Sequence, residues 1–176
     1  LRGFSIDGSE RGGSRTDQFI SAFKKAKESG LGITAHAGES SGPQGVVAAL
    51  DQLGVDRLDH GVRAVEDPAL MSRLAAEGIP LNVCVSSNCH NLYSSYDQHP
   101  LPQLLAKGLI CTINTDDPAM LDIDLSSELV AVADAYDLSL GDLKQLQLNA
   151  IGAAFCPLDV KAQLAELIEN EWSAIT

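Results

Sequence analysis

The chain has 176 residues, of which 45% are hydrophobic and 20% charged, and its formal net charge at pH 7 is −12. This length and composition are typical of one globular domain with a substantial core, which we expect to cover residues 1–176, and they exclude a disordered chain. The acidic balance argues against a nucleic-acid partner, because nucleic-acid sites need clustered Lys and Arg.

The apolar stretches and the cysteines bear on the compartment. No apolar stretch reaches the roughly 20 residues that span a bilayer, so we expect no membrane partner. The cysteines lie mostly in apolar contexts and form no dense framework, which favours a reducing cytoplasm. They are Cys84, Cys89, Cys111 and Cys156.

The chain begins with a predicted strand, a loop and a helix. Residues 1–6 alternate weakly between apolar and polar and predict a strand, and a polar, glycine-rich loop follows over residues 7–14. Thr16 is a predicted N-cap of a helix that ends at Gly30. A second strand, centred near Ile33, comes next.

A helix-to-strand unit then repeats along the chain. Glycines at positions 30, 54, 78 and 108 each stand where a predicted helix turns into a strand. Asp67 and Pro68 open one of these helices. The strands are expected near residues 4, 33, 58, 82 and 112. A polar loop is expected over residues 88–100.

The rest of the chain is predicted to be helical. Apolar residues recur at helical spacing over residues 125–136, 140–155 and 160–172, with Ser139 and Asp159 as predicted caps. Short parallel strands with covering helices indicate an α/β fold, either an open doubly wound sheet or part of an eight-stranded barrel. Both architectures place ligand chemistry at the C-terminal ends of the strands.

Three of the predicted strands end in residues that suit metal and proton chemistry. The residues are His36, Glu39, His60, Asp116 and Asp117. Zn²⁺ accepts imidazole and carboxylate ligands. A second histidine can orient or deprotonate an attacking water, and a carboxylic acid can protonate a leaving group or ring nitrogen. The two adjacent aspartates are expected to point apart, so one can face a metal and the other a substrate.

These motifs resemble the adenosine deaminase family of metal-dependent amidohydrolases. The segments that carry the resemblance are His36-Ala37-Gly38-Glu39, His60-Gly61-Val62-Arg63 and Asn114-Thr115-Asp116-Asp117-Pro118. Residues 3–10, 82–88 and 149–161 resemble the family's fourth strand, its seventh-strand signature and its C-terminal helices. The resemblance follows the family's order along essentially the whole chain and implies strands four to eight of a TIM (β/α)₈ barrel, followed by C-terminal helices.

The resemblance also implies a zinc site and its proton chemistry. One zinc ion per complete site is implied, with His36 and Asp116 as ligands. Glu39 would supply a proton to the purine N1. His60 would orient the water that attacks C6 and take up its proton.

The implied substrate is a 6-aminopurine, either an adenosine-like nucleoside or adenine. Asp117 would hydrogen-bond the purine N7, and Gly8 would offer its backbone N–H to the purine N3. The implied reaction is hydrolytic deamination, which gives the 6-oxo purine and ammonia. This places the chain in purine metabolism.

The sequence departs from the family pattern at its beginning. The family's first strand carries a His-x-His pair that supplies two further zinc ligands, and the sequence contains no His-x-His. A complete barrel also needs about 250 residues. We therefore expect the C-terminal portion of a deaminase barrel. Its missing N-terminal half would come from an upstream segment, another chain or another copy of this chain, and the chain alone is expected to be inactive.

Four other hypotheses remain open. Cys84, Cys89, His90 and His99 could form a structural zinc site, although their spacing is poor for one. A Cys-His nucleophile pair lacks a clear orienting partner. A two-metal amide or ester hydrolase would need a bridging lysine near Gly8, where none stands. The half-barrel could also be a non-catalytic interaction module.

Overall fold

Five parallel strands form one sheet in the computed structural model, which describes residues 1–10 and 16–175. The spatial order is β1-β2-β3-β4-β5, and each neighbouring pair is parallel. The strands are β1 (Gly3–Phe4), β2 (Gly32–Ala37), β3 (Arg57–His60), β4 (Leu81–Val83) and β5 (Cys111–Ile113). All five predicted strands are confirmed, and the fold is α/β. Because spatial order follows chain order, every strand adds to the same growing edge, as in a (β/α) barrel.

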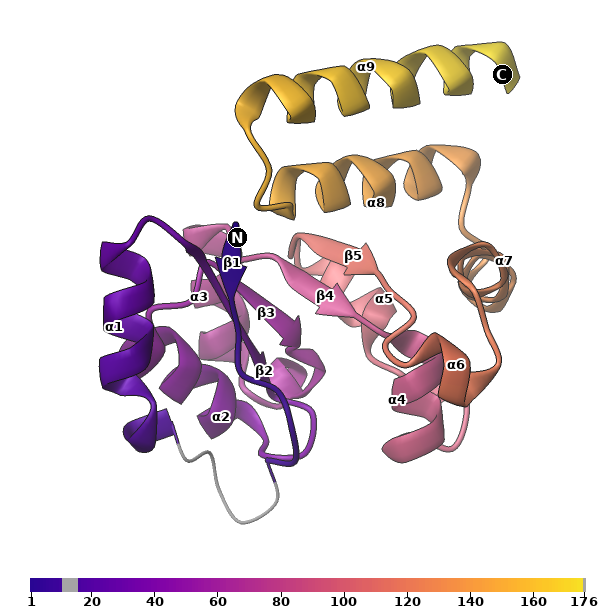
Figure 1. Ribbon diagram of the computed structural model, residues 1–176. Coiled ribbons are helices and arrows are strands. Elements are labelled where there is room, and N and C mark those ends of the chain that lie inside the picture. Colours follow the sequence, from indigo (N-terminus) through magenta and orange to yellow (C-terminus); the bar gives the residue numbers. More distant parts are fainter. Residues whose placement is uncertain (11–15, 176) are drawn as a thin grey trace.

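Helices connect the strands and cover the outer side of the sheet. Figure 1 shows α1 and α2 beside strands β1, β2 and β3. The connecting helices are α1 (Ile20–Glu28), α2 (Pro43–Ala48), α3 (Pro68–Glu77), α4 (Val85–Asn91) and α5 (Leu101–Ala106). Shorter turns complete the connections: η1 (Thr16–Gln18), the π-helical η2 (Ala49–Leu53), η3 (Val62–Glu66) and η4 (Tyr96–Gln98).

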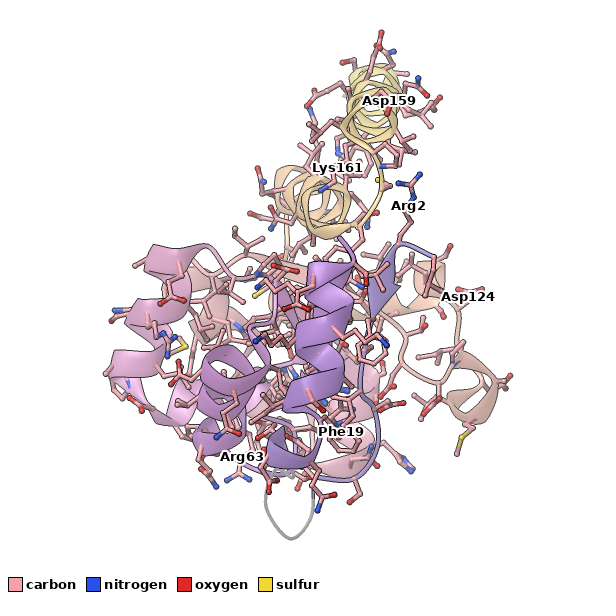
Figure 2. All side chains as sticks on the ribbon, turned by 60° about the vertical axis from the view of Figure 1, so that its left-hand side comes forward. Arg2, Phe19, Arg63, Asp124, Asp159 and Lys161 are labelled. Carbon is pink, nitrogen blue, oxygen red and sulfur yellow. The ribbon has the colours of Figure 1, made fainter. Side chains whose placement is uncertain are left out.

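The last part of the chain is helical, as predicted. It contains α6 (Pro118–Leu121), α7 (Leu125–Tyr136), α8 (Leu140–Ala153) and α9 (Leu158–Ile175). Helix α8 packs on β5, and α9 packs on α8. Figure 2 shows α9 as the layer farthest from the sheet, with Lys161 pointing toward α8. Within the described ranges, no helix combines the length and the apolar character needed to cross a membrane.

The core lies between the sheet and its covering helices. Leu58 and Leu81 are completely buried side chains of the central strands, and buried Phe23 of α1 belongs to the same continuous core cluster. The glycines predicted to end helices adopt left-handed backbone conformations, for example Gly54 and Gly78, both at φ 64°. A side chain is disfavoured at this φ, which explains the recurrence of glycine there.

A close contact ties the C-terminal helices to the N-terminal strands. A Cβ atom on Gly32 would lie 2.4 Å from the ring of Phe155, and one on Gly3 would lie 2.7 Å from it. The guanidinium carbon of Arg57 stands 4.1 Å from the centre of the same ring. Arg57 also donates a hydrogen bond of 3.0 Å to the carbonyl of Ala153. Phe155 thus occupies space that only glycine leaves free on β1 and β2.

Some local predictions are corrected by the structure. Thr16 begins η1, and α1 starts at Ile20 without a side-chain cap. Asp159 lies inside the first turn of α9, whereas Ser139 caps α8 as predicted. Val85 opens helix α4 directly after β4, so part of the loop expected over residues 88–100 is helical. The glycine-rich loop expected over residues 7–14 lies partly outside the described residues.

Candidate active site

A polar pocket of about 360 Å³ lies at the C-terminal ends of the strands. His36, His60 and Asp116 all line it, so the structure brings together predicted residues from three strand ends. Cys84 and Asn82 of the fourth strand end add to the same wall. The location agrees with the general rule that ligands bind at the C-terminal ends of parallel strands.

His36, the half-buried imidazole on β2, is surrounded by carboxylates. Its Nδ1 lies 3.0 Å from Oδ1 of Asp7, and its Nε2 lies 3.0 Å from Oε2 of Glu39. Glu10 Oε2 is 3.9 Å from Nε2. Burial disfavours the charged ring, but the hydrogen bond that the ring donates to Glu39 and the charges of the three carboxylates outweigh it and raise the pKa of His36 to about 9.

Glu39 stands three residues beyond His36 and contacts both histidines of the pocket. The hydrogen bond with His36 is the main reason why the pKa of Glu39 lies below its ordinary value. Its Oε1 is 4.0 Å from Nδ1 of His60 and 3.4 Å from Nδ2 of Asn88. Glu39 is therefore a carboxylate in this arrangement, with one oxygen directed to each histidine.

Glu10 holds the loop that carries Glu39. Its buried carboxylate accepts hydrogen bonds from the backbone N–H groups of residues 38–41, at 2.8, 2.8, 2.7 and 3.3 Å, and from the hydroxyl of Ser41. Glu10 is not among the site residues that the sequence patterns indicate. The one signal that points to it is its place in the segment resembling the family's fourth strand.

His60 ends β3 in a left-handed backbone conformation, with φ 65°. The strand register pairs it with Ala37, yet its ring centre lies 4.5 Å from that of His36. His60 as a whole is only 2% exposed. Its Nε2 lies 3.9 Å from Oδ2 of Asp116. His60 thus stands between Glu39 on one side and Asp116 on the other.

The two adjacent aspartates point to different places. Asp116, also left-handed with φ 64°, accepts a hydrogen bond of 2.6 Å from the hydroxyl of Ser87. Asp117 lines a separate hollow with His90 and Asn91 at the start of α6. The structure therefore does not bring Asp117 into the pocket that holds His36 and Asp116.

Gly8 lies at the pocket margin, where it lines two further hollows together with His36. Its φ is +116°, a conformation that side chains rarely adopt. Its backbone N–H donates a hydrogen bond of 2.6 Å to Oδ1 of Asp7. The N–H expected to meet a purine is thus paired within the chain in this structure.

Two groups of possible metal ligands occur among the described residues. One is His36, Glu39 and His60, and the other is His60, Cys84 and Asp116, with all ligand atoms in each group within 4.8 Å of one another. Imidazole, carboxylate and thiolate are the ligand types that zinc prefers, so this chemistry fits the metal. His36 and Asp116 do not share one group in this arrangement.

The rival cysteine hypotheses gain little from the geometry. Neither group of close ligand atoms in the described part of the chain contains Cys89, His90 or His99. Burial and the neighbouring carboxylates raise the pKa of the Cys84 thiol above its ordinary range. A thiol held protonated is a poor nucleophile.

Comparison with known proteins places this site in a family. The signature of the family described as Adenosine deaminase matches residues 1–171. An adenine deaminase of Cupriavidus metallidurans is 42% identical over 173 residues, which are 98% of this chain and 49% of that protein. An adenosine deaminase of Klebsiella pneumoniae is 40% identical over 151 residues, 85% of this chain and 45% of that protein.

Solved structures agree with the sequence relatives. The adenine deaminase of Arthrobacter aurescens superimposes with a TM-score of 0.93 and 34% identity over 99% of this chain and 53% of that chain. A zinc-bound amidohydrolase from Burkholderia ambifaria superimposes with a TM-score of 0.90 and 30% identity, over 99% of this chain and 49% of that chain. An Arabidopsis protein complexed with GMP superimposes with a TM-score of 0.85 and 28% identity, over 97% of this chain and 50% of that chain.

The chain spans about half the length of the curated relatives it matches. Within that span, the match runs through the strands, the pocket and the C-terminal helices without a large gap in coverage. The resemblance seen in the motifs around His36, His60 and Asp116 is therefore confirmed, and the chain belongs to the adenosine deaminase family.

Proposed function

We propose that the full-length protein containing this chain deaminates a 6-aminopurine by zinc-dependent hydrolysis. The observation that carries the proposal is the convergence of His36, Glu39, His60 and Asp116 at the C-terminal ends of three parallel strands. Relatives named adenine deaminase and adenosine deaminase support the reaction class. The products would be the 6-oxo purine and ammonia.

His36 and Asp116 would contribute two of the zinc ligands. The ligand types around the pocket fit zinc, and a structural neighbour from Burkholderia ambifaria is described with bound zinc. When bound, the metal would lower the pKa of water and thus supply a nucleophile near neutral pH. Ser87 would hold Asp116 in place through the hydrogen bond to its Oδ2.

Glu39 and His60 would carry the proton chemistry. Glu39 would protonate the purine N1, and its carboxylate must first receive a proton because the His36 contact keeps its pKa low. His60 would orient the attacking water from the side of Asp116. Proton uptake by His60 from that water would require an unprotonated Nε2.

The purine would be held by Gly8 and Asp117. Gly8 would release its N–H from Asp7 and donate it to N3, and Asp117 would turn from its separate hollow toward N7. Structural neighbours solved with the purine nucleotides IMP and GMP support a purine ligand. Adenine and adenosine are the substrates to test first, because relatives about 40% identical to this chain are named for them.

The rest of the barrel would come from outside the residues of this chain. β1 pairs only with β2, and β5 only with β4, so both edges of the described sheet offer backbone groups for pairing. The relatives are about twice as long as the matched region. We assign the remaining strands to another part of the full-length protein or to a second chain, and place the activity in the cytoplasm because all four cysteines are free.

Ammonia release by the purified full-length protein tests this function. We expect turnover of adenine or adenosine that is lost on zinc removal by a chelator and restored by one zinc ion per site. Glu39→Gln should lower kcat by roughly 100-fold or more. Glu28→Gln, an exposed change on α1, should leave kcat unchanged. Two metal ions per active site, or full activity in Glu39→Gln, would refute the proposal.

A further inference from the structure

A buried series of hydrogen bonds connects His60 through the side chains of Asn88 and His99 to the backbone of Leu101. Nδ1 of His60 lies 3.1 Å from Nδ2 of Asn88, and Oδ1 of Asn88 lies 3.2 Å from Nε2 of His99. Nδ1 of His99 accepts a hydrogen bond of 3.1 Å from the backbone N–H of Leu101. His60 and His99 are each 2% exposed and Asn88 is fully buried, so water does not compete for these bonds.

At the His99 end of this series, the donor and the acceptor of each hydrogen bond are fixed. A backbone N–H can only donate, so Nδ1 of His99 must accept from Leu101. A neutral His99 then carries its hydrogen on Nε2 and donates it to Oδ1 of Asn88. Burial lowers the pKa of His99 to about 4, which keeps the ring neutral near pH 7.

At the His60 end, a second and independent argument fixes which atom of the Asn88 amide faces His60. Nδ2 of Asn88 faces Nδ1 of His60 at 3.1 Å and also the carboxylate of Glu39 at 3.4 Å, which can only accept. Turning the amide over would place its oxygen against that carboxylate and leave His99 without an acceptor. Both ends therefore require the amide nitrogen of Asn88 to donate to His60.

We infer that Asn88 and His99 are positioning residues that fix His60 in the tautomer with its hydrogen on Nε2. That nitrogen faces Asp116 at 3.9 Å, so His60 presents a donor to an oxygen held between the two side chains. This inference rests on the proposed function for its catalytic meaning. It assigns His60 the orientation of the attacking water and, in place of the proton uptake proposed above for His60, gives uptake of the water's proton to a nearby carboxylate.

The tautomer is directly measurable, because the chain has only four histidines. Long-range ¹H–¹⁵N correlation spectra of the protein labelled with ¹⁵N-histidine distinguish a proton on Nδ1 from one on Nε2. Single His→Gln variants assign the four rings. We expect both His60 and His99 to carry the hydrogen on Nε2 at pH 8. Any substantial population of His60 with a proton on Nδ1 would overturn the inference.

Variants test whether Asn88 and His99 cause this state. Asn88→Asp replaces the donor by a second acceptor, so His60 should move its hydrogen to Nδ1. His99→Phe keeps the edge-on packing with Tyr93 but removes the donor to Asn88, so His60 should populate both tautomers. His99→Gln should restore the Nε2 form, because a glutamine amide can donate to Asn88. His90→Gln, an exposed change on α4, is the matched control and should leave the His60 signal unchanged.

Kinetics of the full-length protein separate this inference from the proposed function. Asn88→Asp should lower kcat for the purine by roughly 10-fold or more and change KM less than kcat. An unchanged His60 tautomer in folded Asn88→Asp, judged by its amide spectrum, overturns the positioning role even if kcat falls. Absence of deamination in the wild type overturns the function, while the tautomer measurement still decides the positioning role.

Discussion

At the scale of single residues, buried polar groups decide how the predicted site is held. Glu10 binds the loop of Glu39, and Ser87 binds Asp116. Asn88 links His60 to a second buried histidine, His99. Burial of these groups would be unfavourable without such partners, so each hydrogen bond both stabilises the fold and orients a part of the candidate site.

Glu10→Gln should destabilise the protein by about 2 to 4 kcal/mol. A glutamine keeps one acceptor oxygen and turns an NH₂ group toward backbone N–H donors that the carboxylate now accepts from. Urea unfolding of Glu10→Gln and of the exposed control Glu28→Gln measures the effect. Equal midpoints for the two variants would show that the loop does not depend on Glu10.

His99 should make stability depend on acid pH. Its pKa is about 4 in the folded chain, against about 6.5 when unfolded. Above pH 6.5 the ring is neutral in both states, and as pH falls toward 4 only the unfolded state binds the proton. Stability is therefore lost over this window, by up to about 3 kcal/mol.

The comparison of wild type with His99→Phe isolates this effect from other groups. The variant starts less stable at pH 7.5, and its free energy of unfolding should fall less steeply between pH 6.5 and pH 4. Urea unfolding at several pH values gives the two slopes, with His90→Gln as the histidine control. Parallel slopes would contradict the assignment of a buried neutral ring to His99.

The residues of the candidate site were predictable from the sequence, and those that support them were not. His36, Glu39 and Asp116 follow short apolar runs, so their place at strand ends is visible in the sequence. Glu10 and His99 meet their partners across 28 and 11 positions of the chain, a proximity that only the folded chain creates. The left-handed backbone of His60, which turns its ring toward His36, leaves no local sequence pattern either.

At the scale of elements, Phe155 is the contact that joins the helical C-terminal part to the first strands. The ring lies over Gly3 and Gly32, and Arg57 stacks on it from β3. Glycine at a strand position normally weakens the strand. Its presence at both positions is explained by the space that the ring needs.

Gly32→Ala should therefore destabilise the protein by about 1 to 3 kcal/mol through overpacking. The same change should cost less in a Phe155→Leu background, where the ring is absent, and a double-mutant cycle measures this coupling.

Gly152→Ala on the exposed side of α8 is the control and should be neutral or stabilising. The single tryptophan, Trp172 on α9, donates to the carbonyl of Leu140 on α8 and reports unfolding by fluorescence. If the losses in unfolding free energy of Gly32→Ala and Phe155→Leu simply add in the double variant, the ring and the glycine do not interact.

Element positions were predicted better than their ends. The four glycines and Ser139 mark boundaries through local backbone chemistry, and the structure confirms them. The second half of helix α4 was expected as loop because most of its residues are polar and follow a strand without a turn signal. Its first turn is instead stabilised from a distance, since Glu128 of α7 accepts a 3.0 Å hydrogen bond from the N–H of Ser86.

At the scale of the whole molecule, the described sheet holds one side of a site. Its five strands follow one another in order, so that β1 and β5 are the two edge strands of the described sheet. The polar pocket lies at the open end between these edge strands. A zinc ion needs about four ligands, and the His-x-His pair that the family resemblance implies as further ligands does not occur in this sequence.

Ammonia release measured side by side tests this half-site proposal most directly. The 176-residue chain alone and the full-length protein are each assayed with adenine and adenosine at equal zinc concentration. We expect turnover by the full-length protein and none measurable by the chain alone. Comparable turnover by the chain alone, or no turnover by the full-length protein, would contradict the proposal.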